Sequence, residues 1–459
     1  MDTELFAFTL LVMSLSLLAG KLLRLNIPLL RKLFLPSSVI GGLVLLLAGP
    51  QALALPFLRE LTAVWETMEV LPAYLINIIF AAFFIGKSIP PLKTVWKLAG
   101  PQICFAQVLT WGQYLVGILA GLFILTPLLG LPEFAGALIE IGFTGGHGTA
   151  AGLAPTFEAL GWPEGQDVGL GMATLGILVG VITGIIMINW ASRRKIIEVD
   201  EASIEKTQEE DTHCEFEDRE EEEPRRAMRP DSIEALSLHL ALLGGAIGIG
   251  YFFLEGLIYL ERVLLLPLGW EGIMDYLPLF PLAMLGGIVI QYIFKHLFRN
   301  HMVIDRKQIN RLQGLSLDIL IVAALGSLDL QVLAQYWEAV ILLALIGIIW
   351  TLLGFVFLAP RMIKNYWFQR GIGDYGQSMG MVAMGLLLIR VADPQNRSEA
   401  LTAFGYKQLL FEPVVGGGLF TSASMPLIAQ LGAETILIVV GVVMVFWLIL
   451  GFNLKRKLE

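Results

Sequence analysis

The stretch "FTGGHGTAAGLAP", residues 143–155, interrupts a chain that is otherwise strongly apolar. It holds four glycines, two threonines, one histidine and a closing proline. Glycine permits positive φ angles and close backbone approach, so we expect helical geometry to break here. Broken backbone inside a membrane is tolerated only where protein or a water-filled cavity covers its unused N–H and C=O groups. The stretch therefore predicts an interrupted membrane segment with main-chain groups available to a ligand.

The composition of the whole chain supports a membrane location. Of the 459 residues, 56% are hydrophobic and 15% are charged, whereas about a quarter of the residues of a soluble domain are charged. Windows of about 17–25 apolar residues recur, and this is the length of a helix that crosses a bilayer. No segment shows the short alternation of a membrane β-barrel. We expect an all-α polytopic membrane protein, with the lipid bilayer as a partner and no nucleic acid.

One segment is acidic and polar. Residues 191–232 carry 15 acidic and 8 basic side chains, a net charge of −7 out of −9 for the chain. Few apolar residues and many like charges do not support a packed core. We expect 191–232 to be a disordered linker, although such charge blocks also bind calcium or a partner in some proteins.

The apolar windows predict eleven spans, at about 4–20, 36–50, 71–87, 101–125, 168–190, 233–260, 273–295, 313–328, 335–358, 404–430 and 433–453. Lys and Arg gather in alternate connections, at 21–34, 87–97, 295–311, 361–370 and the C-terminal tail. Positive residues mark the cytoplasmic side. We expect the N-terminus outside, and the linker and C-terminus inside.

Two glycine-interrupted regions do not fit as simple spans, and each begins and ends on one side. They lie at about 133–165 and 371–400, and we interpret both as re-entrant hairpins. Gly148 and Gly380 occupy corresponding places in them. Five spans and one hairpin then precede the linker (1–190), and five spans and one hairpin follow it (233–430). The order predicts two inverted-topology repeats, an arrangement of many secondary transporters, with an extra helix and basic tail at 431–459.

The breaks supply the candidate binding residues for a small ion or carboxylate, because half-helix ends present free N–H and C=O groups. Helix packing through small residues is the alternative. His147 has a structural role or contacts the substrate, and a lone histidine is not a metal site. Arg390 pairs with a substrate carboxylate or with Asp393. The candidates are Thr144, Gly145, Gly146, His147, Gly148, Thr149, Gly376, Gln377, Ser378, Gly380 and Arg390.

Ionisable and amide groups inside spans are further candidates. Asn77 and Asp318 are sodium ligands or polar helix contacts, and Glu140 and Glu412 lie beside apolar segments. No Walker-type loop, CxxC or HExxH motif occurs. We expect no enzyme and no cofactor, and transport driven by a gradient.

The run "GGHGTAAGLAPTFEALG", followed by "DVGLGMATLGILVGVITG", resembles the bacterial sodium:glutamate symporters. "FLPSSVIGGLVLL" (34–46) and "EPVVGGGLF" (412–420) also resemble that family. The resemblance implies sodium-coupled symport of L-glutamate across the bacterial inner membrane. It further implies a homodimer with a scaffold and a moving transport domain, an elevator-type mechanism, and Na⁺ as the co-transported ion and only metal.

The second hairpin departs from this pattern, because "GQSMGMVAMGLLLIRV" carries methionines and leucines where the family shows threonine, alanine and asparagine. A related acidic amino acid, or an exchanger of another mono- or dicarboxylate on the same fold, is therefore an alternative. A channel or a membrane sensor is the alternative from another class.

Overall fold

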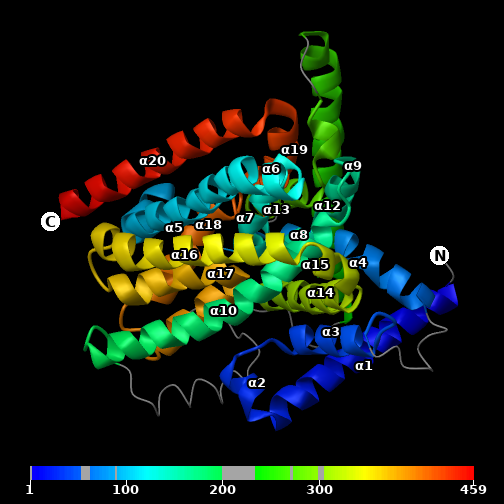
Figure 1. Ribbon diagram of the computed structural model, residues 1–459, viewed down its shortest axis with the longest axis horizontal. Helices are drawn as coiled ribbons and strands as arrows, with labels where there is room; N and C mark the ends of the chain where they lie inside the picture. The colour runs from blue at the N-terminus through cyan, green and yellow to red at the C-terminus, as the bar shows by residue number, and fades with distance from the viewer. Residues whose placement is uncertain are drawn as a thin grey trace. The chain divides into compact units, whose positions relative to one another are not determined.

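The computed structural model describes residues 3–52, 62–87, 90–198, 233–268, 272–297 and 304–458. Within these ranges every regular element is a helix (Figure 1). Nine of the helices described are long and apolar enough to cross a membrane. The prediction of an all-α polytopic membrane protein is therefore confirmed. Residues 199–232, which make up most of the predicted linker, lie outside the described part of the chain.

The helices divide between two compact units, each built from both halves of the sequence. The first unit contains α1 (Thr3–Asn26) except its last residue, α3 (Ser37–Ala48), α4 (Thr62–Ala81), α12 (Ile233–Leu260), α13 (Phe280–Leu297) and α14 (Arg306–Gly326).

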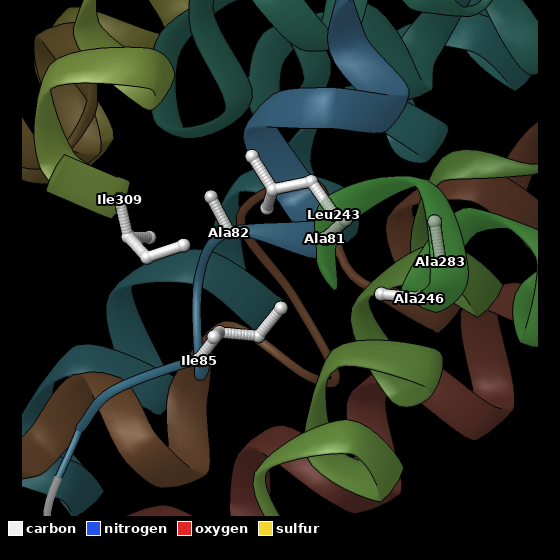
Figure 2. Close-up of a cluster of buried hydrophobic side chains, with 7 residues drawn as sticks. All are labelled: Ala81, Ala82, Ile85, Leu243, Ala246, Ala283 and Ile309. Carbon is white, nitrogen blue, oxygen red and sulfur yellow. The ribbon is translucent and has the colours of Figure 1, made fainter. Parts of the chain in front are cut away.

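Small side chains let the helices of the first unit approach closely. A cluster of seven buried residues joins the end of α4 to α12, α13 and α14 (Figure 2), and four of its members are alanines: Ala81, Ala82, Ala246 and Ala283. A Cβ on Gly250 would lie 2.5 Å from the Ala283 nitrogen, so only glycine fits at this contact of α12 with α13. The Arg306 guanidinium donates to the Ala82 and Ile85 carbonyls and so satisfies the C-terminal end of α4.

The second unit contains the longer series of elements. It begins with α2 (Pro28–Lys32) and α5 (Leu92–Ala120), which continues through η2 (Gly121–Leu125) into α6 (Thr126–Leu129). An interrupted segment and α10 (Gly165–Arg193) follow. The unit ends with α15 (Leu330–Gln335), α16 (Trp337–Met362), α17 (Trp367–Ala392), α18 (Ala400–Phe411), α19 (Leu419–Leu431) and α20 (Ala433–Leu458).

Helix α5 is the central element of this second unit, since α16, α17, α18 and α20 all pack against it (Figure 1). It is buried along most of its length, including three glutamines, Gln102, Gln107 and Gln113. Gly112 leaves room for the indole of Trp350, whose Nε1 donates to the Leu109 carbonyl at 2.8 Å. Buried amides in an apolar helix need partners, and α5 is therefore where long-range polar contacts are expected.

The predicted span at 404–430 is wrong. The region 404–430 is not a continuous helix, because residues 412–418 separate α18 from α19. Gly416 and Gly417 have φ angles of 74° and 101°, which L-residues with a Cβ avoid. Hydropathy did not distinguish this break, because the broken stretch "PVVGGGLF" is as apolar as a helix.

Candidate functional site

The segment containing "FTGGHGTAAGLAP" folds back on itself. The chain passes through η3 (Glu133–Ala137), α7 (Leu138–Glu140), η4 (Ile141–Gly145), α8 (Gly146–Gly152) and α9 (Ala154–Ala159). Its two ends lie together, with the ring centroids of Phe134 and Trp162 only 5.9 Å apart. The helical path breaks at Gly146, whose φ of 74° and ψ of −169° define a region adopted almost only by glycine. The break therefore lies inside the stretch from which it was predicted.

Helix α17 is also interrupted, at Gly380 (φ −164°, ψ 51°) and Met381 (φ 57°, ψ −179°). A Cβ on Gly376 would lie 3.0 Å from the Gly385 Cα, and one on Gly373 would lie 2.7 Å from Ile389 Cγ1. In a straight helix these pairs would be about 13 and 24 Å apart along the axis. The two halves of α17 therefore pack against each other as a helical hairpin.

The letters "GQSMG" at 376–380 match the GxSxG pattern of hydrolases. The nucleophile elbow of those enzymes requires a strand, a sharp turn and then a helix, with an exposed serine. Here Ser378 is 2% exposed and lies inside the first half of α17. The match is therefore one of letters and not of structure.

The two breaks touch each other. A Cβ on Gly146 would lie 3.3 Å from both the Cβ and the Sδ of Met381. The two residues share nearly the same unusual backbone conformation, although one is glycine and the other is not. The sequence paired Gly148 with Gly380, whereas the residues that correspond in conformation are Gly146 and Met381. Both interrupted segments belong to the second unit.

Gln113 of α5 joins the two broken segments. The Thr144 hydroxyl donates to Gln113 Oε1 at 2.7 Å, and Gln113 Nε2 donates to the Ser378 carbonyl at 2.6 Å. The same nitrogen also donates to the Thr351 hydroxyl at 3.2 Å. One buried amide thus holds a threonine before the first break and a carbonyl before the second.

His147 faces α10 and not the second break. Its Nε2 lies 3.0 Å from the Thr174 hydroxyl, and that hydroxyl donates to the Leu170 carbonyl. Nε2 is therefore the protonated nitrogen, and Nδ1 is left as a buried acceptor with no partner among the residues that the structure describes. Thr149 donates to the Gly145 carbonyl at 3.1 Å, within its own segment. These contacts favour the structural role of His147 among the two that the sequence allowed.

Glycines on α10 bring this helix against both broken segments. A Cβ on Gly176 would lie 2.8 Å from the Phe143 ring, and one on Gly180 would lie 2.8 Å from Met379 Cβ. One glycine face therefore supports the residues before the first break and the residues before the second. Small-residue packing is the reason for the glycine pattern of "DVGLGMATLGILVGVITG".

Glu140 connects the first broken segment to the unpredicted break at 412–418. Its carboxyl group is fully buried and accepts from the Gly416 N–H at 2.8 Å, the Thr421 hydroxyl at 3.1 Å and the Tyr114 hydroxyl at 2.5 Å. Glu140 thus joins α7, α5 and the break at 412–418 through hydrogen bonds.

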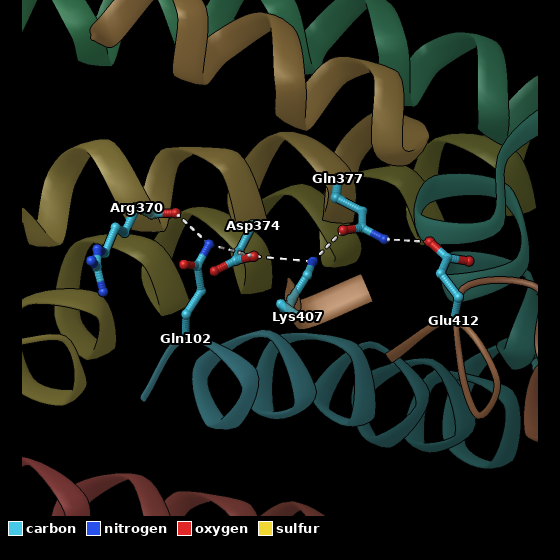
Figure 3. Close-up of polar contacts among 6 residues, drawn as sticks. All are labelled: Gln102, Arg370, Asp374, Gln377, Lys407 and Glu412. Carbon is cyan, nitrogen blue, oxygen red and sulfur yellow. Dashed lines mark hydrogen bonds and ion pairs between the residues drawn. The ribbon is translucent and has the colours of Figure 1, made fainter. Parts of the chain in front are cut away.

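A second buried polar network lies beside α17 (Figure 3). It runs from Gln102 through Asp374, Lys407 and Gln377 to Glu412. Lys407 Nζ lies 3.1 Å from Asp374 Oδ1, both side chains are fully buried, and Nζ also donates to Gln377 Oε1. Gln377 Nε2 donates to Glu412 Oε1 at 3.0 Å.

The structure does not gather all the predicted residues. Arg390 lies in the last turn of α17, nine residues after Met381 and so about 13 Å along the axis from the break. Asn77 of α4 and Asp318 of α14 belong to the first unit, whereas both broken segments belong to the second. The Asn77 amide donates to the Ala73 and Tyr74 carbonyls of its own helix. These bonds use the amide nitrogen, whereas a sodium ion would bind the Oδ1 atom, so both roles of Asn77 stay predictions.

Sequence reasoning missed three residues that connect the site, namely Gln113, Asp374 and Lys407. Each is a polar or charged side chain within an apolar segment, which is by itself a signal of function in a membrane protein. That rule applied to α5 and α18 would have singled out Gln113 and Lys407.

Interrupted helices that present main-chain groups near the middle of a helical bundle are typical of the class of secondary membrane transporters. The comparison with known families is consistent with this class. A family model described as sodium/glutamate symporter matches residues 5–368. The chain belongs to the sodium/glutamate symporter family, whose members are transporters and not enzymes.

Two curated relatives are similar to part of the chain. Both are named sodium/glutamate symporter, one from Escherichia coli (strain K12) and one from Shigella flexneri. Each is 31% identical over 180 residues, which is 38% of this chain and 42% of the relative. The match thus spans less than half the length of these relatives.

Proposed function

We propose that this protein is a sodium-coupled symporter of L-glutamate or a related acidic amino acid. The observation that carries the proposal is the contact between Gly146 and Met381, two helix breaks of matching conformation in one compact unit. Membership of the sodium/glutamate symporter family supports sodium as the coupling ion and glutamate as the cargo.

The chemistry of the breaks suits these ligands. The half of α17 that begins after Met381 has its first N–H groups at its positive end, which favours a carboxylate. The half-helices that end at Gly145 and Gly380 present carbonyl oxygens, the ligands that Na⁺ takes at such breaks. We propose that Thr144, Gly145, Gly146, Gly380 and Met381 line the substrate and ion site, with Gln377 and Ser378 behind them.

The two units suggest the mechanism. We propose that the second unit, which contains both broken segments, carries the cargo as an elevator-type transport domain. The first unit would then be the scaffold and the dimer-forming part of a homodimer in a bacterial inner membrane. Each unit takes helices from both halves of the chain, which supports the inverted-repeat proposal with two re-entrant hairpins. The N-terminus outside and the linker and C-terminus inside complete this proposal.

The test is uptake of a panel of radiolabelled amino acids and mono- and dicarboxylic acids into proteoliposomes, with and without an inward Na⁺ gradient. We expect saturable, Na⁺-dependent uptake of L-glutamate, with trans-stimulation in counterflow. Linear flux that does not saturate would instead favour a channel, and absence of flux for every compound would favour a sensor.

One observation favours a second candidate cargo. The side chain of Met381 stands at the second break, where the first break has glycine, and it occupies space beside Gly146. A different mono- or dicarboxylate, carried by exchange on the same fold, would fit a site altered in this way. Na⁺-independent exchange of such an acid in the same panel would establish this alternative and exclude the symporter.

A further inference from the structure

Lys407 is a buried ammonium group inside the unit that contains both helix breaks. It lies on α18, and its ammonium contacts Asp374 and Gln377 of the first half of α17. The ring centroids of Phe404 and Phe411 lie 4.2 and 4.4 Å from Nζ. A carboxylate oxygen, an amide oxygen and two ring faces are the partners that a monovalent cation takes in proteins. A buried ion pair often adds little net stability to a fold, so stability alone does not explain why a lysine is buried at position 407.

The cluster has more acceptor oxygens than Lys407 uses. Asp374 Oδ2 and Gln102 Oε1 are both buried, and neither has a hydrogen-bond partner within the described part of the chain. They belong to groups in contact, because Gln102 Nε2 donates to Asp374 Oδ1 at 3.4 Å (Figure 3). Exchanging the amide oxygen and nitrogen of Gln102 would not repair this, because Nε2 also donates to the Arg370 carbonyl at 3.3 Å. Buried acceptors without a donor are unfavourable, and they mark a position suited to a positive charge.

The formal charges of the network balance only because of Lys407. Asp374 and Glu412 are acidic, and Lys407 and Arg370 are basic. The Arg370 guanidinium donates to the Leu98 carbonyl, so its charge acts on Asp374 only at longer range. Without the ammonium, one negative charge would remain in a buried site that must then take up a cation or become neutral.

We propose that Asp374 and Gln377 form a monovalent-cation site in which the ammonium of Lys407 stands in place of a diffusible cation such as Na⁺. Both ligands use hard oxygen atoms, which suit Na⁺ and not a transition metal. Among the residues that the structure describes, no group of three His, Cys, Asp or Glu side chains is placed to hold a metal. The site uses side chains of α17 and α18 and not the main-chain groups of the breaks, and Gln377 is the residue that it shares with the substrate site proposed above.

The consequence concerns coupling, and this part rests on the proposed function. A tethered ammonium moves with the transport domain and is never released. The chain would then require one fewer diffusible cation per substrate than the same chain with the site open.

The experiment compares Lys407→Ala with Lys407→Met. The alanine variant removes the charge and opens space for a cation, whereas methionine removes the charge but fills the space. Thermal unfolding midpoints of the purified full-length variants are measured in increasing NaCl, with choline chloride at equal ionic strength. The baseline is the change of the unfolding midpoint of the unaltered protein with Na⁺, because this change contains the effect of every other Na⁺ site.

We expect Lys407→Ala to gain Na⁺-dependent stability above this baseline. Each tenfold rise in Na⁺ above the dissociation constant should raise its folding equilibrium constant by about a further tenfold. Lys407→Met and the double variant Asp374→Asn/Lys407→Ala should show no gain.

An unchanged Na⁺ dependence in Lys407→Ala overturns the proposal. So does failure of Lys407→Ala to fold in NaCl while Lys407→Met folds, because a site able to hold Na⁺ would restore the lost charge. Neither measurement requires transport. A chain that carries no acidic amino acid yet gains Na⁺-dependent stability in Lys407→Ala would refute the symporter and leave this inference standing.

Discussion

Gly146 is the residue on which the first break depends. Its φ of 74° and ψ of −169° exclude a β-branched side chain, and an added Cβ would lie 3.3 Å from Met381 Sδ. We expect Gly146→Val to abolish uptake. Gly161→Val is the matched control, because Gly161 has a φ of 76° with no atom within 4 Å of an added Cβ. Equal uptake by the two variants, both eluting as folded protein in size-exclusion chromatography, would contradict the assignment of the break as the site.

Met381 carries backbone strain that Gly146 does not. A non-glycine residue in this conformation costs about 1–3 kcal/mol. Replacing Met381 with glycine relieves that strain, so we expect a net loss of stability below about 1 kcal/mol. Met379 is fully buried in regular helix, and Met379→Gly should lose about 3–6 kcal/mol. Thermal unfolding in detergent compares the two variants, and similar losses would show that Met381 is not strained.

At the scale of elements, the two broken segments are held together by α5. Gln113 takes part in both contacts, and its partners Thr144 and Ser378 lie 31 and 265 positions away in the sequence. The hydrogen bonds therefore fix the relation of one hairpin to the other. A carrier whose cargo lies between two hairpins needs that relation to be held by something other than the cargo.

This arrangement predicts energetic coupling between Gln113 and Thr144. In a double-mutant cycle of Gln113→Met and Thr144→Val, we expect an interaction energy of about 0.5–3 kcal/mol. Thr144→Val combined with Ser16→Ala is the control. Ser16 lies in the other unit and donates to the Gly41 carbonyl, so this pair shares no partner and should be additive. Additivity of the first pair in thermal unfolding would refute the bridging role of Gln113.

At the scale of the whole molecule, every candidate contact described above lies outside the acidic segment 191–232. Removing residues 200–228 should therefore leave uptake largely intact. Replacing the same residues with a Gly/Ser linker of equal length separates the effect of composition from that of length. Loss of uptake in both variants would show that the acidic sequence itself takes part in transport.

Local features of the sequence determined the helical membrane class and the first break. A long apolar window predicts a membrane helix, because backbone N–H and C=O groups in lipid must hydrogen-bond to one another. The glycines of "FTGGHGTAAGLAP" lie where the helix ends. The break in "PVVGGGLF" was missed, because its residues are as apolar as a span and its departure from helix shows only in the φ angles of Gly416 and Gly417.

The pairings were decided by tertiary structure alone. Lys407 lies 33 positions from Asp374 and Gln102 lies 272 positions from it, and no local pattern states that these side chains meet. Nor did the sequence indicate that Met381, and not a glycine, faces Gly146. A glycine in the sequence indicates that the backbone can adopt unusual φ and ψ angles at that position. It does not indicate which groups lie against that position, because these depend on how distant helices pack. The sequence thus determined the position of the first helix break. The packing of α5, α10, α17 and α18 decided which residues the two helix breaks contact.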